Sequence, residues 1–351
     1  MAYTAIDDPS AYFKVQLWTG DDTSPRAIAF DDTDTDMQPD IVWIKKRNDA
    51  ASHTLFDAVL GAGSTKGLAT DNMSREGLLD GSIGTTSAYG YLSAFGSDGF
   101  TVTTGTSSDG YINNGSDTYV AWCWKESATA GCDILTYTGN ATDDTDISHS
   151  LSAVPHLIIG KVRDVNGEQW KVYHHKNTSA PETDHLRLHT NDATTDDATV
   201  WSDEAPTSSV FTLGNTNGIN ESGKLFVSYL WSEKQGFSKF GSYVGNNAGA
   251  DGIFCYTGFR PALVIQKAAS AGNGEWQMTD NERDPFNPSD SKLNADRNNA
   301  EFSDFAIDIL SNGFKTKADG ADQQDSGVTY VYIAFAEAPF VNSNGVPCNA
   351  R

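Results

Sequence analysis

The chain is poor in cysteine and has no long apolar run. Among its 351 residues are four cysteines, Cys123, Cys132, Cys255 and Cys348, and none belongs to a CxxC pair. This spacing matches neither a disulfide scaffold nor a structural zinc site. No stretch of about 18 apolar residues is present, which excludes a membrane-spanning helix. Residues 1–9 lack the basic start and apolar stretch of a signal peptide, so we expect synthesis in a cytoplasm without export by the standard route.

Basic residues are also scarce. Lysine and arginine number 24 against 47 aspartates and glutamates, for a formal net charge of −23. This balance argues against nucleic acid as a partner, because phosphate binding needs a basic surface. It equally argues against adsorption to an anionic membrane. A cation or a basic partner stays open, although a heavily solvated acidic surface is the favoured interpretation.

The signatures of common enzymes are missing too. The sequence contains no GxSxG, phosphate-binding loop, HExxH or dinucleotide fingerprint. A glycosidase needs only two carboxylates at a suitable separation, which no sequence reveals, so a glycan-cleaving enzyme is a remote alternative. We predict that the chain is not an enzyme. We assign no catalytic residue, no cofactor and no metal, and leave the ligand-binding residues unassigned.

What the sequence does contain is one pattern repeated three times. Residues 39–45, 155–161 and 261–267 each start with proline, continue through an apolar run and end with lysine; the prolines are 116 and 106 residues apart. A second pattern of aromatic and apolar residues ends at Glu126, Glu233 and Glu337, which are 107 and 104 residues apart. Two independent patterns with one period indicate a triplicated unit. Threefold recurrence of the glutamate favours a structural role, such as binding main-chain N–H groups of a neighbouring loop, over catalysis.

The secondary-structure signal is strand. Short β-branched and aromatic runs alternate with clusters of Gly, Asn, Asp, Ser and Thr. Continuous apolar runs at 41–44, 157–159 and 263–265 predict central strands that are buried on both faces. We predict an all-β protein of three tandem antiparallel β-sandwich repeats, jelly-roll-like, of roughly 105–115 residues each. Ser52 to Leu60 is the one expected helix.

The predicted organisation is an N-terminal arm at residues 1–12, repeats at 13–128, 129–236 and 237–340, and a C-terminal arm at 341–351. The linkers near 127–131 and 235–238 are short, so the repeats should pack against one another. The alternative is one large body with internal threefold pseudosymmetry. The insertion at 61–92 is expected to be functional or to form an interface. Both arms are expected to fray unless they are held.

Carboxylates and histidines form the candidate metal sites. Asp31–Asp36 carries alternate aspartates like the start of a calcium loop, Asp143–Asp146 occupies the same loop in the second repeat, and Asp251 is what the third retains. The glycine and distal glutamate of a calcium loop are missing, which favours solvated acidic turns. The histidine cluster comprises His174, His175, His185 and His189, with the last two expected on one strand face. Zinc would suit imidazoles, but polar surface histidines are the favoured interpretation.

Aromatic side chains suggest sugar stacking as a further possibility. The tryptophans of the apolar pattern are assigned to the core: Trp122, Trp124 and Trp231. Aromatic residues in more polar surroundings are the better surface candidates: Tyr89, Tyr91, Trp201 and Trp276.

Several segments also carry a resemblance. They are DIVWIKKRN at 40–48, SHTLFD at 52–57, YVAWCWK at 119–125, AIDDPSAYF at 5–13, FTLG at 211–214 and GFSKFGSY at 236–243. In these segments the chain resembles a repeated, largely uncharacterised β domain of tailed bacteriophages. The resemblance covers nearly the whole chain and implies a virion structural protein of the tail-fibre or host-recognition type. It supplies no catalytic residues.

The resemblance implies a location in the virion and a tail-fibre or spike component that attaches to the host surface. The expected partners are other virion proteins and a host-surface glycan or receptor, in a homo-oligomer for which a trimer is expected. Weak sites would gain avidity from copy number. The alternative is a capsid-decoration or tail-assembly protein with no host ligand, and the remote alternative is a surface-glycan depolymerase.

Overall fold

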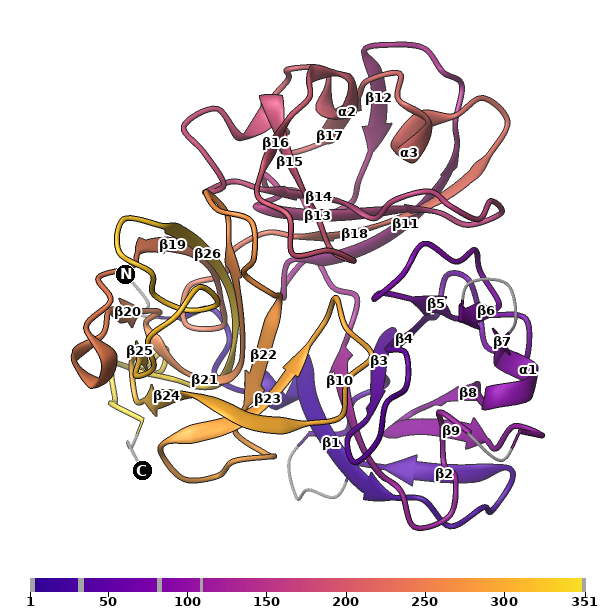
Figure 1. The fold of residues 1–351 in the computed structure, drawn as a ribbon, viewed down its shortest axis with the longest axis horizontal. Helices are drawn as coiled ribbons and strands as arrows, with labels where there is room; N and C mark the ends of the chain where they lie inside the picture. Colours follow the sequence, from indigo (N-terminus) through magenta and orange to yellow (C-terminus); the bar gives the residue numbers. More distant parts are fainter. Residues whose placement is uncertain (1–3, 31–34, 81–83, 108–109, 349–351) are drawn as a thin grey trace.

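The computed structural model describes residues 4–30, 35–80, 84–107 and 110–348. It is nearly all β, with 41% of residues in strands and 6% in helices, so the predicted fold class is confirmed. Among the described residues, no helix is long and apolar enough to cross a membrane. We keep the predicted bounds as names for a first (13–128), second (129–236) and third (237–340) unit. Figure 1 shows them around a common centre, and their standing as tandem domains stays a prediction.

The first unit has a five-stranded sheet of order β1-β10-β3-β4-β5 and a three-stranded sheet of order β2-β9-β8, and side chains of both share one apolar cluster. A short hairpin, β6-β7, lies in the insertion. The elements are η1 (Pro9–Ala11), β1 (Phe13–Thr19), β2 (Arg26–Ala29), β3 (Ile41–Lys46), β4 (Thr54–Asp57), β5 (Leu68–Ala69), β6 (Leu78–Asp80), β7 (Gly84–Thr85), α1 (Thr86–Tyr89), β8 (Tyr91–Gly96), β9 (Gly99–Thr103) and β10 (Thr118–Trp124).

The second unit has a six-stranded sheet of order β11-β18-β13-β14-β15-β16 and a two-stranded sheet, β12-β17. Its elements are β11 (Cys132–Thr138), β12 (Thr145–Ser148), β13 (Leu157–Val162), β14 (Lys171–His174), η2 (Pro181–Thr183), β15 (Asp184–Arg187), β16 (Thr195–Asp196), α2 (Ala198–Trp201), β17 (Val210–Leu213), α3 (Asn217–Asn220) and β18 (Leu225–Trp231).

The third unit is a single eight-stranded sheet of order β19-β26-β21-β22-β23-β24-β25-β20, which curls until it nearly closes. Its elements are β19 (Ser238–Val244), η3 (Gly249–Asp251), β20 (Phe254–Tyr256), β21 (Phe259–Ala268), β22 (Gln277–Asp280), β23 (Ser289–Asn294), β24 (Phe302–Leu310), β25 (Gly313–Thr316) and β26 (Thr329–Pro339).

The main sheets of the three units start with the same strand order: β1-β10-β3-β4, β11-β18-β13-β14 and β19-β26-β21-β22. At one end of each first strand, an aromatic ring stacks on its cross-strand neighbour with ring centres 5.1 Å apart. These pairs are Trp18–Tyr119, Tyr137–Phe226 and Tyr243–Tyr330. The glycine two residues later, such as Gly20, lies so close to a facing carbonyl that a Cβ atom would sit 1.9 Å from the oxygen of Asn114. The repeated aromatic-x-Gly step is therefore a packing requirement.

The centre of the molecule is aromatic. Trp124, Trp231 and Phe335 end the apolar runs of β10, β18 and β26, and their rings contact one another with centres 5.5 to 6.4 Å apart. One continuous apolar core includes buried residues of all three units. The predicted two-sided burial of the central strands is confirmed, because every residue of β3, β13 and β21 is buried.

Neighbouring units are joined by hydrogen bonds that repeat around the centre. Trp170 Nε1 of the second unit donates to the carbonyl oxygen of Ala69 in the first, at 2.9 Å. Trp276 Nε1 of the third unit donates to the carbonyl oxygen of Arg187 in the second, at 2.8 Å. At the remaining junction the equivalent residue is His53 of the first unit, which lies against the main chain of Asn294 in the third. The contacts therefore run in one direction and close a ring.

A second set of contacts runs in the same direction around the ring. The Tyr229 hydroxyl donates to buried Asp57 Oδ2 of the first unit at 2.7 Å, and Trp122 Nε1 donates to buried Asp280 Oδ2 of the third at 3.0 Å. At the second-to-third junction, the position that corresponds to Tyr229 is Ile333, which has no donor. There His174 replaces the aspartate, and its Nε2 lies 3.2 Å from the carbonyl oxygen of Tyr332.

The insertion at 61–92 is an interface element. Its Glu76 pairs with Lys66 in the insertion, at 2.9 Å, and with Arg163 of the second unit, at 2.7 Å. Its Arg75 N–H donates to Asn166 Oδ1 of the second unit at 2.9 Å. These contacts, together with Trp170, join the insertion to the neighbouring unit.

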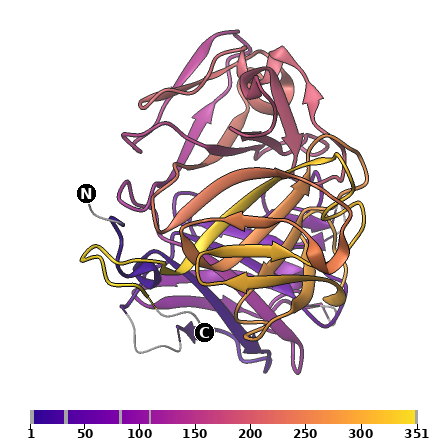
Figure 2. The ribbon, with the colours of Figure 1, turned by 90° about the vertical axis from the view of Figure 1, so that its left-hand side faces the viewer.

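Both arms are held by the chain itself. In Figures 1 and 2 the two ends of the chain lie on the same side of the molecule. The hydroxyl of Thr4 donates to the carbonyl oxygen of Gln235 at 3.0 Å, in the linker between the second and third units. The N–H of Ser343, in the C-terminal arm, donates to Asp7 Oδ1 at 2.6 Å. The described parts of the arms therefore bind this chain.

The expected helix at Ser52 to Leu60 is wrong. Residues 54–57 form β4, which pairs with β3 on one side and with β5 on the other. All four residues are buried, so burial on both faces outweighs local helix propensity.

The central aromatic contact yields a stability prediction. Phe335→Ala should lower the free energy of unfolding by about 3–5 kcal/mol, because the side chain is 1% exposed and neighbours from other units cannot fill its space. Phe286→Ala is the matched control, because its side chain is 80% exposed and the change should stay within about 0.5 kcal/mol. Urea unfolding followed by tryptophan fluorescence measures both. Equal midpoints for the two variants would contradict a shared core.

Candidate functional site

A groove of about 370 Å³ lies between the first and third units. One wall is the strand β1, with Phe13, Lys14, Val15, Gln16 and Leu17. The remaining lining residues are Ser10, Ala262, Asn281, Glu282, Ala336 and Glu337. Successive side chains of a strand point to opposite faces of the sheet, so a space on one face would be lined by alternate residues. Five consecutive residues line this groove, which therefore runs along the edge of the strand.

The geometry of β1 shows which main-chain groups face the groove. β1 pairs only with β10, and the flanking bonds Lys125 N–H to Tyr12 O and Gly20 N–H to Asp117 O place the even-numbered residues in the hydrogen-bonded pairs. In an antiparallel ladder the alternate residues turn their N–H and C=O groups away from the partner strand. Val15 and Leu17 therefore direct theirs into the groove. Gln16 Nε2 covers the carbonyl oxygen of Leu17 at 2.8 Å.

The opposite wall is polar and buried. Asn281 is 6% exposed, its Nδ2 donates to Glu337 Oε2 at 2.9 Å, and its Oδ1 has no hydrogen-bond partner among the described residues. Arg260 Nε lies 2.5 Å from the same carboxylate oxygen of Glu337. The described residues that line the groove include no histidine or cysteine. They offer hydrogen-bonding and charged groups.

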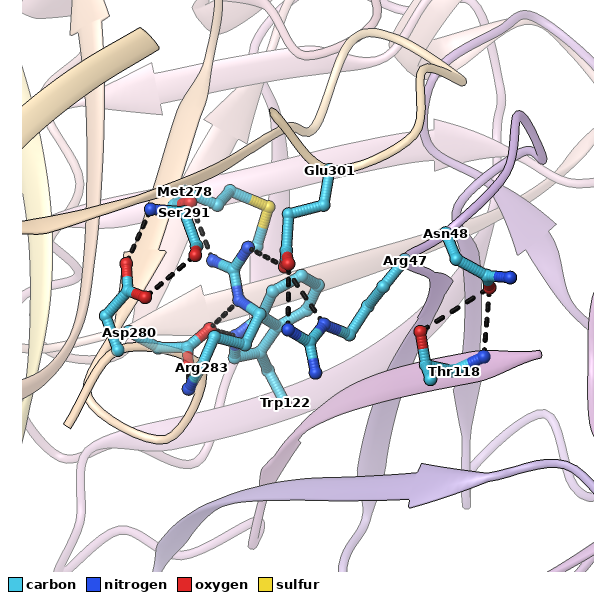
Figure 3. Close-up of polar contacts among 10 residues, drawn as sticks. Arg47, Asn48, Thr118, Trp122, Met278, Asp280, Arg283, Ser291 and Glu301 are labelled. Atoms are coloured by element: carbon cyan, nitrogen blue, oxygen red, sulfur yellow. Dashed lines mark hydrogen bonds and ion pairs between the residues drawn. The ribbon is translucent and has the colours of Figure 1, made fainter. Parts of the chain in front are cut away.

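A network of ion pairs fixes this wall against the first unit, as Figure 3 shows. The guanidinium of Arg283 lies between Asp280 Oδ2, at 2.6 Å, and Glu301 Oε2, at 3.0 Å. Arg47 of the first unit reaches Glu301 Oε1 at 2.8 Å. Trp122 also donates to Asp280, so the first unit holds the turn that carries Asn281 directly through Trp122 and indirectly through the contact of Arg47 with Glu301.

The repeated glutamates have three different partners. Glu126 Oε1 accepts from the main-chain N–H of Ile134 at 3.3 Å, which is the structural role that the sequence suggests. Glu233 pairs with Lys239 at 2.5 Å, and Glu337 pairs with Arg260. Burial and the adjacent Asp133 raise the pKa of Glu126 to about 7.

The predicted surface histidines are buried, so that interpretation is wrong. His174 and His185 are fully buried and His189 is 9% exposed, while His175 is half-buried. Burial lowers the pKa of His174 and His185 to about 3, and that of His175 and His189 to about 4. β15 ends at Arg187, so His189 lies beyond the strand that carries His185. His174 and His175 lie against carbonyl oxygens of the third unit, whereas His185 lies 3.0 Å from Lys171 Nζ within the second unit.

The aromatic candidates divide differently from the prediction. The core assignment of Trp122, Trp124 and Trp231 is confirmed. Trp201 and Trp276 are 2% and 1% exposed, so their assignment to the surface is wrong. Polar neighbours in sequence misled here, because the Trp276 indole crosses a unit junction. Tyr89 and Tyr91 are half-buried, and Tyr89 stacks on Tyr111.

The acidic loops are bound to hydroxyl groups. Asp31, Asp32 and Asp34 lie outside the described residues, and Asp36 is exposed. Ser202 Oγ donates to Asp143 at 3.1 Å and also to Asp144, and Asp251 is exposed in η3. The described part of the chain holds no group of three or more potential metal ligands.

Sequence reasoning missed a set of buried lysines. Lys45, Lys161 and Lys267 end the repeated Pro…Lys pattern, and all are fully buried. Each ammonium donates to carbonyl oxygens, for example Lys45 to Lys46 at 2.6 Å and Lys161 to Glu168 at 2.7 Å. Burial lowers the pKa to about 7 for Lys45 and about 8 for the other two. The signal was a charged residue that recurs three times at the end of an apolar run.

Arg283 should be the most sensitive residue behind the groove wall. Arg283→Met leaves the fully buried Asp280 carboxylate without its cation, and we expect a loss of about 3–5 kcal/mol in the free energy of unfolding. Arg297→Met is the control, because Arg297 is 48% exposed in its pair with Glu275 and the change should stay below about 1 kcal/mol. Thermal denaturation of both variants checks this. Similar small losses would show that the network is dispensable.

Asp57 should make stability depend on pH. Burial raises its pKa to about 6, so between pH 4 and 6 the folded chain keeps a proton that the unfolded chain releases. The stability from this group is present at low pH and is lost as the pH rises through 6. Asp57→Asn should therefore gain up to about 3 kcal/mol relative to the parent between pH 4 and 7. Tyr229→Phe, which removes the hydroxyl donor, should move the window to higher pH. Urea titrations across this range test both, and parallel pH profiles would contradict the assignment.

Comparison with known proteins identifies the family of the chain. Residues 8–339 match the family described as Domain of unknown function (DUF7483). No curated protein and no solved structure matches the chain at a significant level. Since the family match spans almost the whole chain and includes the strands that build all three units, the chain belongs to the family Domain of unknown function (DUF7483).

Proposed function

We propose that this chain is a structural protein of a bacteriophage virion, in the tail-fibre or spike, where it attaches to the host surface. The observation that carries the proposal is the common core of the three units. A body whose sheets all bury one face at one centre is rigid and presents its loops outward, which suits a particle component. The resemblance of the segments quoted above to a repeated phage β domain supports the same assignment.

Exposed aromatic side chains support a contact surface on the third unit. Phe254 and Tyr256 on β20 are 46% and 59% exposed. At the corresponding positions of β12 the exposed residues are Asp146 and Ser148. Aromatic faces stack on the apolar faces of sugars and pack well at protein interfaces. A host glycan or receptor is the proposed ligand, and multivalent display would convert weak contacts into firm attachment.

The proposed role is not enzymatic. The groove between the first and third units offers hydrogen-bonding and ionic groups, and one of its two acidic side chains, Glu337, is already engaged by Arg260. Such a carboxylate is a poor candidate for a general acid or nucleophile, whose proton affinity must be tuned for transfer.

Localisation on intact particles is the first test. Gold-labelled antibody against the chain should mark the tail or its distal appendages, because attachment proteins must reach the host first. The purified chain should then bind host cells, and the binding should fall when Tyr256→Ala removes an exposed aromatic ring. Ser148→Ala, at a corresponding exposed position of β12, is the matched control.

Other outcomes distinguish the alternatives. High-copy label over the head, with no binding to cells, would identify a capsid-decoration protein. Release of reducing ends from host-surface glycan would identify a depolymerase. Unlabelled particles would reject a virion role altogether.

A further inference from the structure

We propose that the outer edge of β1 receives an extended, basic polypeptide segment as an added strand in the groove between the first and third units. This partner goes beyond the attachment function proposed above and does not depend on it.

The edge is open at its middle. The N–H and C=O of Val15 and the N–H of Leu17 point into the groove and make no hydrogen bond to a described residue. Only the carbonyl oxygens further along are covered, Leu17 by Gln16 and Thr19 by Arg26. A strand adds to such an edge at a spacing of roughly 4.8 Å and bonds alternate residues. The groove follows five consecutive residues, which is room for a short strand of roughly 17 Å.

The two equivalent edges are closed by the chain itself. On β11, the residue that corresponds to Val15 is Ile134, and its N–H is accepted by the carboxylate of Glu126. On β19 the corresponding residue is Phe240, and its carbonyl oxygen lies 2.6 Å from His175 Nε2. At the third-to-first junction, Glu337 corresponds to Glu126 and Asn281 corresponds to His175. Glu337 pairs with Arg260 and Asn281 donates to Glu337, so neither is recorded as bonded to β1. Within the described part of the chain, β1 is the one edge of the three for which no such covering group is found.

The opposite wall indicates the chemistry of the occupant. Asn281 Oδ1 is buried, lacks a donor among the described residues and belongs to a residue that lines the groove. A buried acceptor of this kind is costly until a donor reaches it, and an amide N–H or an ammonium supplies one. Within the groove Glu337 is paired with Arg260 and Lys14 also lines the space, so it is the net charge of −23 of the whole chain that favours lysine or arginine in the segment. Regularly spaced main-chain groups favour a polypeptide over a saccharide.

The test is a selection of peptides on the full-length chain. Heptapeptides from a random display library would be enriched on the immobilised protein, and the Kd of synthetic winners measured by calorimetry. We expect lysine or arginine to be enriched in the winners. Methylating the main-chain nitrogens at alternate residues should weaken binding at least about tenfold in one register and leave it unchanged in the other.

A proline variant tests the edge from the protein side. Val15→Pro removes an outward N–H and leaves the ladder to β10 intact, and it should weaken the peptide about three- to tenfold. Thr136→Pro is the matched control, because Thr136 is an exposed, outward-facing position of β11, and it should leave the Kd unchanged. Amide exchange of Val15 and Leu17 should be fast in the free protein and slow with peptide bound. That exchange measurement needs no variant and so is independent of any misfolding.

The proposal is overturned if no peptide is enriched, or if both methylation registers behave alike. It is equally overturned if winners bind Val15→Pro as tightly as the parent. Protection of Val15 by a neutral oligosaccharide, such as chitobiose, with no response to peptides, would assign the groove to a glycan instead. If the peptide test fails, the proposed attachment to the host is not affected. If the antibody labels no particles, the proposed binding of a peptide to β1 is not affected.

Discussion

The contact of Trp124, Trp231 and Phe335 at the centre is the constraint on which the rest of the molecule depends. Each ring ends the apolar run of the strand that lies second in its unit's main sheet, so all three sheets must turn one face inward. Burial of large aromatic surfaces in a common place makes separation of any one unit expensive in free energy. The polar residues buried near the junctions must then find hydrogen-bond partners inside the molecule, on the neighbouring unit.

Buried polar groups need hydrogen-bond partners, and this requirement explains why the three junctions resemble one another and still differ. Buried Asp57 accepts a hydrogen bond from the Tyr229 hydroxyl, and buried Asp280 accepts one from the Trp122 indole. At the third junction the donor's position is occupied by Ile333, and the aspartate's position by His174. The open edge of β1 has a related origin. The linker from β10 to β11 carries Glu126, which covers β11, and a second short linker joins β18 to β19, whereas no linker joins β26 to β1. The groove thus lies at the one junction of the three that no linker crosses, where hydrogen bonds and ion pairs such as Arg47–Glu301 hold the two units together.

Much of the architecture could be predicted because repetition is visible in sequence. The proline-to-lysine pattern marks β3, β13 and β21, whose continuous burial follows from their unbroken apolar runs. Burial of polar residues could not be predicted in the same way. Trp276 has polar neighbours in sequence and is buried where its indole reaches the carbonyl oxygen of Arg187 in the second unit. Lys161 ends an apolar run, and its ammonium is buried against the carbonyl oxygen of Glu168 in its own unit. The groove could not be foreseen either, since it arises from the absence of a bond at Val15 that Ile134 and Phe240 do possess.

The exchange of aspartate for histidine at His174 also bears on how the chain reaches its native state. Units of similar sequence in one chain are prone to pair in the wrong order during folding, because each β4-like strand meets three β10-like candidates. If β14 packed against β10 or β18, the His174 imidazole would face the Trp122 indole or the Tyr229 hydroxyl, which in the native structure donates to a carboxylate. A β4 or β22 strand placed beside β26 would bury a carboxylate against Ile333 with nothing to neutralise it. Divergence among the junctions therefore encodes the cyclic order of assembly, and full symmetry would erase that information.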